Sequence, residues 1–312
     1  MKKTIFFILT MLSLALLLGA CAPENAPAVE APAPEMMFFS DDMGNKLEFS
    51  EYPQAILSIS ASTTETLFAI SAGEQLIGRE DMSLYPEEAL ALPSIGSLWG
   101  DLPTEAILAL EPDLVVAAEI ISAEQVAALQ ELGLQVYWQA NPTTYEELWE
   151  NLRDFGALTG HIDETETLVA DLDARVKAVQ GKIMPLSYMP TVFYELDATD
   201  PANPWTTGSG TFIDYIINTA GGLNAASELQ GDYTQISAEQ LIAVNPQIIL
   251  LGDALYGVTP ESVAERAGWD AIIAVQEGAI YSIDPNILSV PGPRLVDGLE
   301  ETAKLLHPGI WE

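Results

Sequence analysis

One apolar face, repeating every three or four positions, runs through residues 163–184 and predicts a single long helix. The residues on this face are Leu168, Leu172, Val176, Val179 and Ile183. We expect Asp163 to cap the helix with Glu166 as its capping partner, and Pro185 to end it. About twenty helical residues at a rise of 1.5 Å make a rod of roughly 30 Å, which suits either an ordinary surface helix or a connector between two lobes.

The segments on both sides of this helix alternate short apolar strands with amphipathic helices. After an opening hairpin (36–39 and 46–49), strands are expected at 55–60, 76–78, 113–117, 134–138, 191–195, 247–251 and 280–283. Helices are expected from Thr63 or Thr64 to 72, then at 101–111, 123–132, 145–158, 212–219, 237–245 and 294–306, and residues 203–210 are expected to form a polar loop. Continuous apolar runs such as 113–117 are typical of strands buried on both faces of a parallel sheet. The predicted fold class is therefore α/β.

An internal repeat supports two lobes of the same kind. Residues 103–117 and 237–251 each contain a helix, a proline and an apolar strand. Glu105 and Pro112 of the first segment correspond to Glu239 and Pro246 of the second at one common separation. This match predicts two Rossmann-like α/β lobes, 36–158 and 186–312, joined by a single long backbone helix within 159–185, with a ligand cleft between the lobes.

The N-terminus has the pattern of an export signal. Lys2 and Lys3 precede an apolar run, residues 5–18, that is too short to span a membrane comfortably, and Leu-Gly-Ala comes directly before Cys21. This resembles the bacterial lipoprotein box, which implies lipidation of Cys21 after residues 1–21 are processed. Residues 22–35 are rich in Pro, Ala and Glu, so we expect a disordered tether that holds the folded part off a membrane.

The charge balance narrows the choice of partners. Lys and Arg total 11 against 46 Asp and Glu, a net charge of −35. Nucleic acid is excluded as a partner because binding phosphates needs a basic surface. An anionic ligand would meet an unfavourable long-range field, although the acidity can equally serve solubility or reflect a saline habitat.

Catalytic and metal-binding motifs are missing from the sequence. His161 and His307 are the only histidines, too few for an expected transition-metal site, although a single Tyr can hold a haem. The chain has no G-x-S-x-G, H-E-x-x-H or P-loop motif, and Gly208-Ser209-Gly210 lacks the spacing of a nucleophile elbow. We therefore expect no enzyme, no metal site and no resident cofactor.

Aromatic residues in loops are the strongest candidates for a binding site. Tyr85, Trp99 and Trp205 lie between predicted strands and helices, where they either cover the core of their own lobe or line a cleft for a large, flat ligand. We assign Trp138, Trp149 and Trp269 to the hydrophobic core. Arg294 begins the last predicted helix, where it can face the cleft or form a surface salt bridge.

Taken together, these segments make the chain resemble the lipid-anchored substrate-binding proteins of ABC importers for iron-siderophores, haem and cobalamin. The resemblance spans about residues 38–309. It is carried by the lipobox at Cys21, AILSIS (55–60) with TETL (64–67), LIG (76–78), Tyr85-Pro86, the two repeat segments, GWDAI (268–272) and PGPRL (291–295).

The resemblance implies a role for each candidate residue. In this family one glutamate on each lobe meets arginines of the permease, and the matching positions are Glu105 and Glu239. Tyr85, Trp99 and Trp205 fall where cobalamin binders place aromatic residues around the corrin. Glu195 and Arg294 fall near the ligand loops of the second lobe, and Val290 stands where siderophore and haem relatives often have an arginine.

The function that we expect is non-catalytic capture of a corrinoid by a monomeric lipoprotein outside the cytoplasm, anchored to the cell membrane. It would deliver the ligand to an ABC permease and its ATPase. A ferric siderophore or haem is the alternative ligand. A surface-anchored hydrolase and an adhesive surface protein are the alternatives of other classes.

Overall fold

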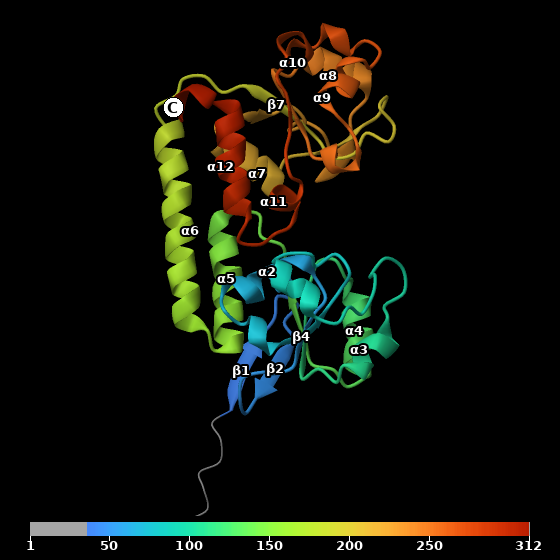
Figure 1. Cartoon of the computed structure of the whole chain (residues 1–312), viewed down its shortest axis with the longest axis vertical. Helices are drawn as coiled ribbons and strands as arrows, with labels where there is room; N and C mark the ends of the chain where they lie inside the picture. Colours follow the sequence, from blue (N-terminus) through green and yellow to red (C-terminus); the bar gives the residue numbers. More distant parts are fainter. Residues whose placement is uncertain (1–35, 312) are drawn as a thin grey trace, which may run out of the picture. The chain divides into compact units, whose positions relative to one another are not determined.

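Two parallel sheets organise the described part of the chain (Figure 1). The computed structural model describes residues 36–311, so the predicted signal peptide, Cys21 and the tether lie outside the described residues. We call the part built on the first sheet the first lobe and the part built on the second sheet the second lobe. This arrangement confirms the predicted α/β fold with two lobes.

The first sheet has the strand order β4-β3-β5-β6, with all neighbours parallel. Its strands are β3 (Ile56–Ser58), β4 (Leu76–Arg79), β5 (Leu114–Ala118) and β6 (Val136–Gln139). Its helices are α2 (Ala61–Ala69), α3 (Thr104–Ala109) and α4 (Ala123–Glu131), with short 3-10 turns at Gly73–Gln75 and Glu87–Ala91. An antiparallel hairpin, β1 (Met37–Ser40) with β2 (Lys46–Phe49), precedes them as predicted. Every residue of β5 is buried, because the sheet is covered on both faces.

The second sheet repeats this plan with the order β12-β11-β7-β9. Its strands are β7 (Thr191–Glu195), β9 (Leu223–Asn224), β11 (Ile248–Leu251) and β12 (Ile280–Ser282). Its helices are α7 (Phe212–Thr219), α8 (Ala238–Val244), α9 (Pro260–Ala264), α10 (Ile273–Glu277), α11 (Asn286–Ser289) and α12 (Leu295–Leu306), with 3-10 turns at Ala254–Tyr256, Trp269–Ala271 and Pro308–Ile310.

The predicted polar loop at 203–210 is partly wrong, because it contains a strand. β8 (Trp205–Thr207) pairs antiparallel with β10 (Tyr233–Gln235). Its Trp-Thr-Thr sequence has high strand propensity, and a partner distant in sequence satisfies its backbone. Trp205 thereby stands on a fixed ribbon.

Two long helices lie side by side along the lobes, α5 (Tyr145–Thr159) and α6 (Ile162–Ile183) (Figure 1). Gly156 of α5 allows their close approach, because a Cβ atom there would lie 2.4 Å from the hydroxyl oxygen of Thr165. Arg175 of α6 donates to Asp297 at 2.5 Å and to Glu300 at 3.0 Å, which ties α6 to α12. In residues 36–311, no helix is both long and apolar enough to cross a membrane.

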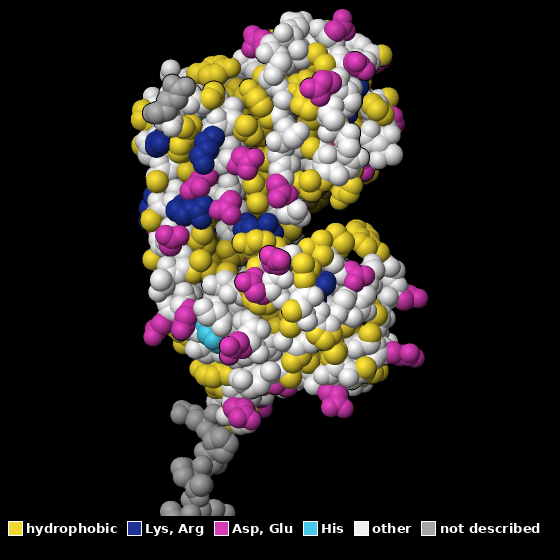
Figure 2. All heavy atoms as spheres, viewed as in Figure 1, with side chains coloured by type: hydrophobic (Ala, Val, Ile, Leu, Met, Phe, Trp, Pro, Cys, Tyr) yellow, Lys and Arg dark blue, Asp and Glu magenta, His cyan; other side chains and the backbone are white. Residues whose placement is uncertain are grey.

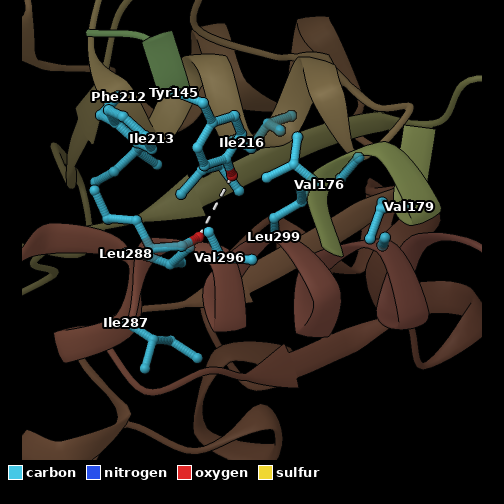
Figure 3. Packing of buried hydrophobic residues seen from close by; sticks show 14 of the residues in the cluster. Tyr145, Val176, Val179, Phe212, Ile213, Ile216, Ile287, Leu288, Val296 and Leu299 are labelled. Atoms are coloured by element: carbon cyan, nitrogen blue, oxygen red, sulfur yellow. Dashed lines mark hydrogen bonds between the residues drawn. The ribbon is translucent and has the colours of Figure 1, made fainter. Parts of the chain in front are cut away.

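The core of the second lobe continues into these two helices. Tyr145 of α5 packs against Phe212 of α7 edge to face, with 5.2 Å between ring centres, and its hydroxyl donates to the carbonyl oxygen of Leu295 at 3.4 Å (Figure 3). Farther along α5, Phe155 and Leu158 belong to a core cluster of the first lobe. The two lobes are therefore joined through packed helix faces.

Two predicted helix caps are wrong. α6 begins at Ile162 after His161, which makes no side-chain cap, and Glu166 instead accepts from Arg153 of α5 at 2.7 Å. The helix α2 begins at Ala61 after Ser60, so Thr63 and Thr64 are helical. Glu166 is thus an ion-pair partner of α5, and the Thr64 hydroxyl donates to the Ser58 hydroxyl and does not cap α2.

Candidate functional site

A cavity of about 1270 Å³ opens at the carboxyl ends of the strands of the second lobe. The residues after β7 (196–199), after β11 (252–253) and after β12 (285–286) line it, because parallel strands bring their following loops to one edge. Trp99 of the first lobe contributes to the lining from the other side. Figure 2 shows a hollow between the lobes with hydrophobic side chains at both edges.

The two predicted loop tryptophans line this same cavity. Trp99 is 83% exposed, and its backbone N–H donates to the Ser97 hydroxyl at 3.1 Å, in a loop that also contains Gly96 and Gly100 with positive φ. Trp205 on β8 is 42% exposed. Large apolar rings with this much exposure, facing one hollow, are typical of a binding surface. The core assignments of Trp149 and Trp269 are confirmed, since both are buried, and Trp138 is half-buried.

Tyr85 and Arg294 come together where the lobes meet. The guanidinium carbon of Arg294 lies 3.8 Å from the centre of the Tyr85 ring, a cation–π contact. Arg294 also donates to Glu65 of α2 from its backbone N at 3.0 Å and from Nε at 2.7 Å. These residues line a smaller cavity of about 220 Å³, and Asn286 lines both cavities.

Glu195 has surroundings that its sequence position did not indicate. Its side chain is fully buried at the end of β7 and accepts hydrogen bonds from Nη1 and Nη2 of Arg266, at 2.5 and 2.8 Å. Burial raises the pKa of the Glu195 carboxyl, and Arg266 opposes that rise. The side chain is absent from the cavity lining, which begins at the next residue, Leu196. Glu195 therefore supports the cavity floor in this structure.

The cavity lining is acidic and contains no Lys, Arg or His. Its charged residues are Asp197 and Asp253, and burial raises the pKa of the Asp253 carboxyl. Every arginine in residues 36–311 already donates to protein oxygens: Arg79 to backbone carbonyls, Arg153 to Glu166, Arg175 to Asp297 and Glu300, Arg266 to Glu195, and Arg294 to Glu65. The cavity thus presents aromatic rings and carboxylates without a cation of its own.

Within the described residues, no group of three His, Cys, Asp or Glu side chains is placed to hold a metal ion. His307 lies within 3.1 Å of the Gly221 carbonyl oxygen and is buried, so it has a structural contact. His161 precedes α6 and lies 3.3 Å from the Thr159 hydroxyl.

Glu105 and Glu239 occupy equivalent places in the two lobes. Each lies in the first turn of a short helix, α3 for Glu105 and α8 for Glu239, and each is exposed. In α8, Ser237 and Gln240 form a capping box that fixes the start of the helix. The internal repeat therefore places one exposed carboxylate on each lobe.

Sequence reasoning missed Glu65, Asp253 and Tyr256 as residues of the site. Tyr256 is 82% exposed and lines the cavity, and it follows the apolar strand β11 in a loop with Gly257. Glu65 is the one charged residue in the segment 61–70. A lone charge among uncharged residues of a buried helix indicates that it pairs with an oppositely charged group elsewhere in the fold. Asp253 had a weaker signal, its position directly after a buried strand.

Comparison with known proteins identifies the family to which this chain belongs. The profile of the family described as "Periplasmic binding protein" matches residues 56–287. An uncharacterized ABC transporter substrate-binding lipoprotein, YvrC of Bacillus subtilis, is 28% identical over 100% of both chains. A cobalamin-binding protein of Halobacterium salinarum is 25% identical over 93% of this chain and 80% of its own length.

A solved structure agrees with these relatives. The periplasmic heme-binding protein RhuT from Roseiflexus sp. RS-1, in apo form, superposes with a TM-score of 0.73 at 26% identity, over 82% of this chain and 99% of its own. The prediction that the chain is not an enzyme is confirmed by its membership in a family of transport binding proteins. The chain therefore belongs to the periplasmic binding protein family, whose members bind iron-siderophores, haem or cobalamin, and it is a homologue of ABC-transporter substrate-binding lipoproteins.

Proposed function

We propose that this protein captures a corrinoid in the cavity between its lobes and delivers it to the permease of an ABC importer. The single observation that carries the ligand assignment is the lining of the cavity, which combines Trp99, Trp205 and Tyr256 with two carboxylates and no cation. Its volume, about 1270 Å³, is above the range of roughly 300–1,000 Å³ that suits most small ligands.

A corrinoid fits this lining better than the alternative ligands. Its ring offers a wide apolar face for the tryptophans, and its rim carries primary amides, which donate hydrogen bonds to carboxylates. Haem carries two carboxylates and a ferric catecholate carries a negative charge, so each would need the cation that this lining lacks. Similar proteins named for cobalamin and for haem are 25% and 26% identical to this chain, so the choice between these ligands rests on the cavity lining.

A ferric siderophore without net negative charge, such as a hydroxamate complex, is the second candidate. It would satisfy the same carboxylates and would meet no electrostatic penalty. A titration of the purified protein with cyanocobalamin, haemin and a ferric hydroxamate, followed by tryptophan fluorescence, separates the candidates. We expect saturable quenching by cyanocobalamin, and its absence would contradict the corrinoid proposal.

We also propose that the protein is lipidated at Cys21 and acts outside the cytoplasm as a monomer, with residues 22–35 as a tether. The lipobox sequence and the similarity to a lipoprotein over the whole chain support this. Metabolic labelling with a fatty acid tests it: the native chain should incorporate label, and Cys21→Ala should not. Incorporation of label by the variant would refute the anchor.

Docking on the permease completes the proposal. The equivalent positions of Glu105 and Glu239, one exposed carboxylate on each lobe, support pairing with two basic sites on a permease. Contact with the permease through both lobes would hold a ligand between the lobes over the transport path.

A further inference from the structure

The hollow between the lobes has a second compartment beside the main cavity. This second cavity has a volume of about 260 Å³ and shares Ser289 with the main cavity. Its lining includes Glu119, which directly follows β5 of the first lobe, and Asp232 and Tyr233 of the second lobe. The register of the β8–β10 ribbon places Tyr233 on the same face as Trp205. The aromatic surface therefore extends from the main cavity into the second one.

The linings of these two cavities carry four carboxylates and contain no Lys, Arg or His. The carboxylates are Asp197 and Asp253 in the main cavity and Glu119 and Asp232 in the second. All except Asp253 are exposed to solvent. Burial raises the pKa of the Tyr233 hydroxyl, and the charges of Asp232 and Glu119 raise it further, as expected for a ring close to two carboxylates.

Two arginines near these cavities are each neutralised by a glutamate. Arg266 is close enough to act on the charge of Asp253, but it is absent from the linings and donates to Glu195. Arg294 lines only the small side cavity and donates to Glu65. A ligand in the main and second cavities is therefore surrounded by negative charge that no nearby cation balances.

Asp253 gives an independent indication of the chemistry of the ligand. The residue is 3% exposed at the wall of the main cavity, and its Oδ2 accepts the backbone N–H of Ala198 at 3.0 Å. Its Oδ1 has no hydrogen-bond donor among residues 36–311, and the nearby Glu195 carboxylate is an acceptor as well. A buried acceptor without a donor is costly, so a ligand that brings a donor or a positive charge is favoured here.

Corrinoids differ in charge according to one part of the molecule. Complete cobalamin carries a nucleotide loop, which is attached through an anionic phosphodiester. A cobinamide lacks this loop but keeps the flat ring and the primary amides, and with one cyanide and one water on its cobalt it has a net positive charge. A phosphate on any arm that enters either cavity would meet carboxylates and no cation.

We propose that the site prefers cationic corrinoids without the phosphate-bearing nucleotide loop over complete cobalamin. This inference rests on the proposed function of the interlobe cavity as a corrinoid site, and it deepens that function by naming the class of corrinoid. Asp253 attracts the cationic ligand and accepts a hydrogen bond from one of its amides. Glu119 and Asp232 disfavour a phosphate in the second cavity.

Calorimetric titration of the purified wild-type protein at neutral pH tests this preference. The ligands are aquocyanocobinamide, its phosphate ester and cyanocobalamin. We expect cobinamide to bind at least about tenfold more tightly than either of the others, and added salt to narrow the difference by screening the exposed carboxylates. The ester differs from cobinamide by the phosphate alone, so it separates charge from size. Equal affinities for cobinamide and its phosphate ester would overturn the proposal.

The decisive variant combines Glu119→Gln with Asp232→Asn, two changes at exposed side chains. It should raise the affinity for cobinamide phosphate about tenfold, because the repulsion is removed, and a misfolded protein would show no such gain. Glu261→Gln, which removes an exposed carboxylate of α9 outside both linings, is the matched control and should leave all three affinities unchanged. No gain in the double variant, or an equal gain in the control, contradicts a role for the cavity carboxylates.

Asp253→Asn tests the buried acceptor separately. The variant should weaken cobinamide binding about tenfold and cyanocobalamin binding less, because Asn keeps the shape of the side chain and removes its charge. Equal losses for the two ligands would contradict recognition of charge by Asp253. If this variant does not fold, the exposed double variant still decides the proposal.

The wild-type titrations distinguish this inference from the proposed function. If neither cobinamide nor cyanocobalamin binds, the corrinoid assignment fails and the preference fails with it. If cyanocobalamin binds as tightly as cobinamide or more tightly, only the present inference fails.

Discussion

Trp99 and Trp205 line one cavity from different lobes, although each is placed by its own local structure. Trp99 stands on a loop between two positive-φ glycines, Gly96 and Gly100, and Trp205 stands on the β8–β10 ribbon. Neither ring belongs to a core cluster of the described residues. The two rings therefore contribute exposed apolar surface to the cavity and little to the hydrophobic core.

Trp99→Ala and Trp205→Ala should each weaken cyanocobalamin binding about tenfold or more, since each removes a large apolar contact from the ligand. Because Trp99 is 83% exposed, its replacement should change the free energy of unfolding by less than about 0.5 kcal/mol. Isothermal titration and urea unfolding measure the two effects. Trp269→Ala is the contrasting control: this ring is 1% exposed, so its loss should cost about 3–5 kcal/mol of stability. Equal binding by Trp99→Ala and wild type would remove Trp99 from the site.

The double variant Glu105→Ala and Glu239→Ala should reduce uptake of the ligand and leave its affinity intact, because both carboxylates are exposed on helices outside the cavity lining. Uptake by cells and titration of the purified protein measure the two quantities. Matched controls are Glu124→Ala and Glu261→Ala, which remove exposed first-turn glutamates from α4 and α9. A loss of affinity in the double variant, or an equal loss of uptake in the controls, would contradict docking through the repeat positions.

Replacing two helical glycines by alanine should change the stability of the protein in opposite directions. Gly181 of α6 has no neighbouring atom within 4 Å of the position that an alanine methyl group would take, so Gly181→Ala should stabilise the protein by about 0.5–1 kcal/mol through helix propensity. Gly156→Ala would place a methyl group 2.4 Å from the Thr165 hydroxyl oxygen, so we expect destabilisation of about 1–3 kcal/mol by overpacking. Chemical denaturation measures both. If Gly156→Ala is as stable as wild type, α5 and α6 do not pack this closely.

Stability should depend on pH through buried carboxyls. Burial raises the pKa values of Glu65, Glu195 and Asp253 above 4.5, 4.5 and 3.8. A raised folded-state pKa means that the native state binds more protons than the unfolded state, so the free energy of unfolding should fall as pH rises from about 4.5 toward neutrality. The large negative net charge acts in the same direction. Urea unfolding at several pH values measures the slope.

Two variants should change the slope of stability against pH with opposite signs, each in its own pH range. Glu195→Gln removes a group with a raised pKa, so stability should fall less steeply with rising pH. A hydrogen bond from Arg175 lowers the pKa of the Glu300 carboxyl, so the contribution of Glu300 is present at neutral pH and lost in acid. This contribution grows with pH only up to about 4.5, so Glu300→Gln should change the slope below about pH 4.5, where it removes a rise of stability with pH. Slopes that change in the same direction in both variants would refute this assignment.

The sequence by itself determined the elements and their repetition. Apolar periodicity predicted the extent of α6 to within a residue at each end, and α7 at 212–219, because burial of one helix face requires that spacing. Continuous apolar runs predicted β5 and β11, and the internal repeat predicted that Glu105 and Glu239 lie at equivalent places in two lobes. These features depend on residues close together in the chain.

Only the tertiary structure decided which partner each charged residue has. Nothing in the local sequence joins Glu65 to Arg294, or Glu195 to Arg266, because these contacts form when separate elements pack together. The same reason explains why Glu166 pairs with Arg153 and does not cap α6, and why Trp205 lies on a ribbon with a distant partner. A buried charge needs an oppositely charged or hydrogen-bonding partner. Which residue is that partner depends on which elements pack together in the low-dielectric interior of the folded protein.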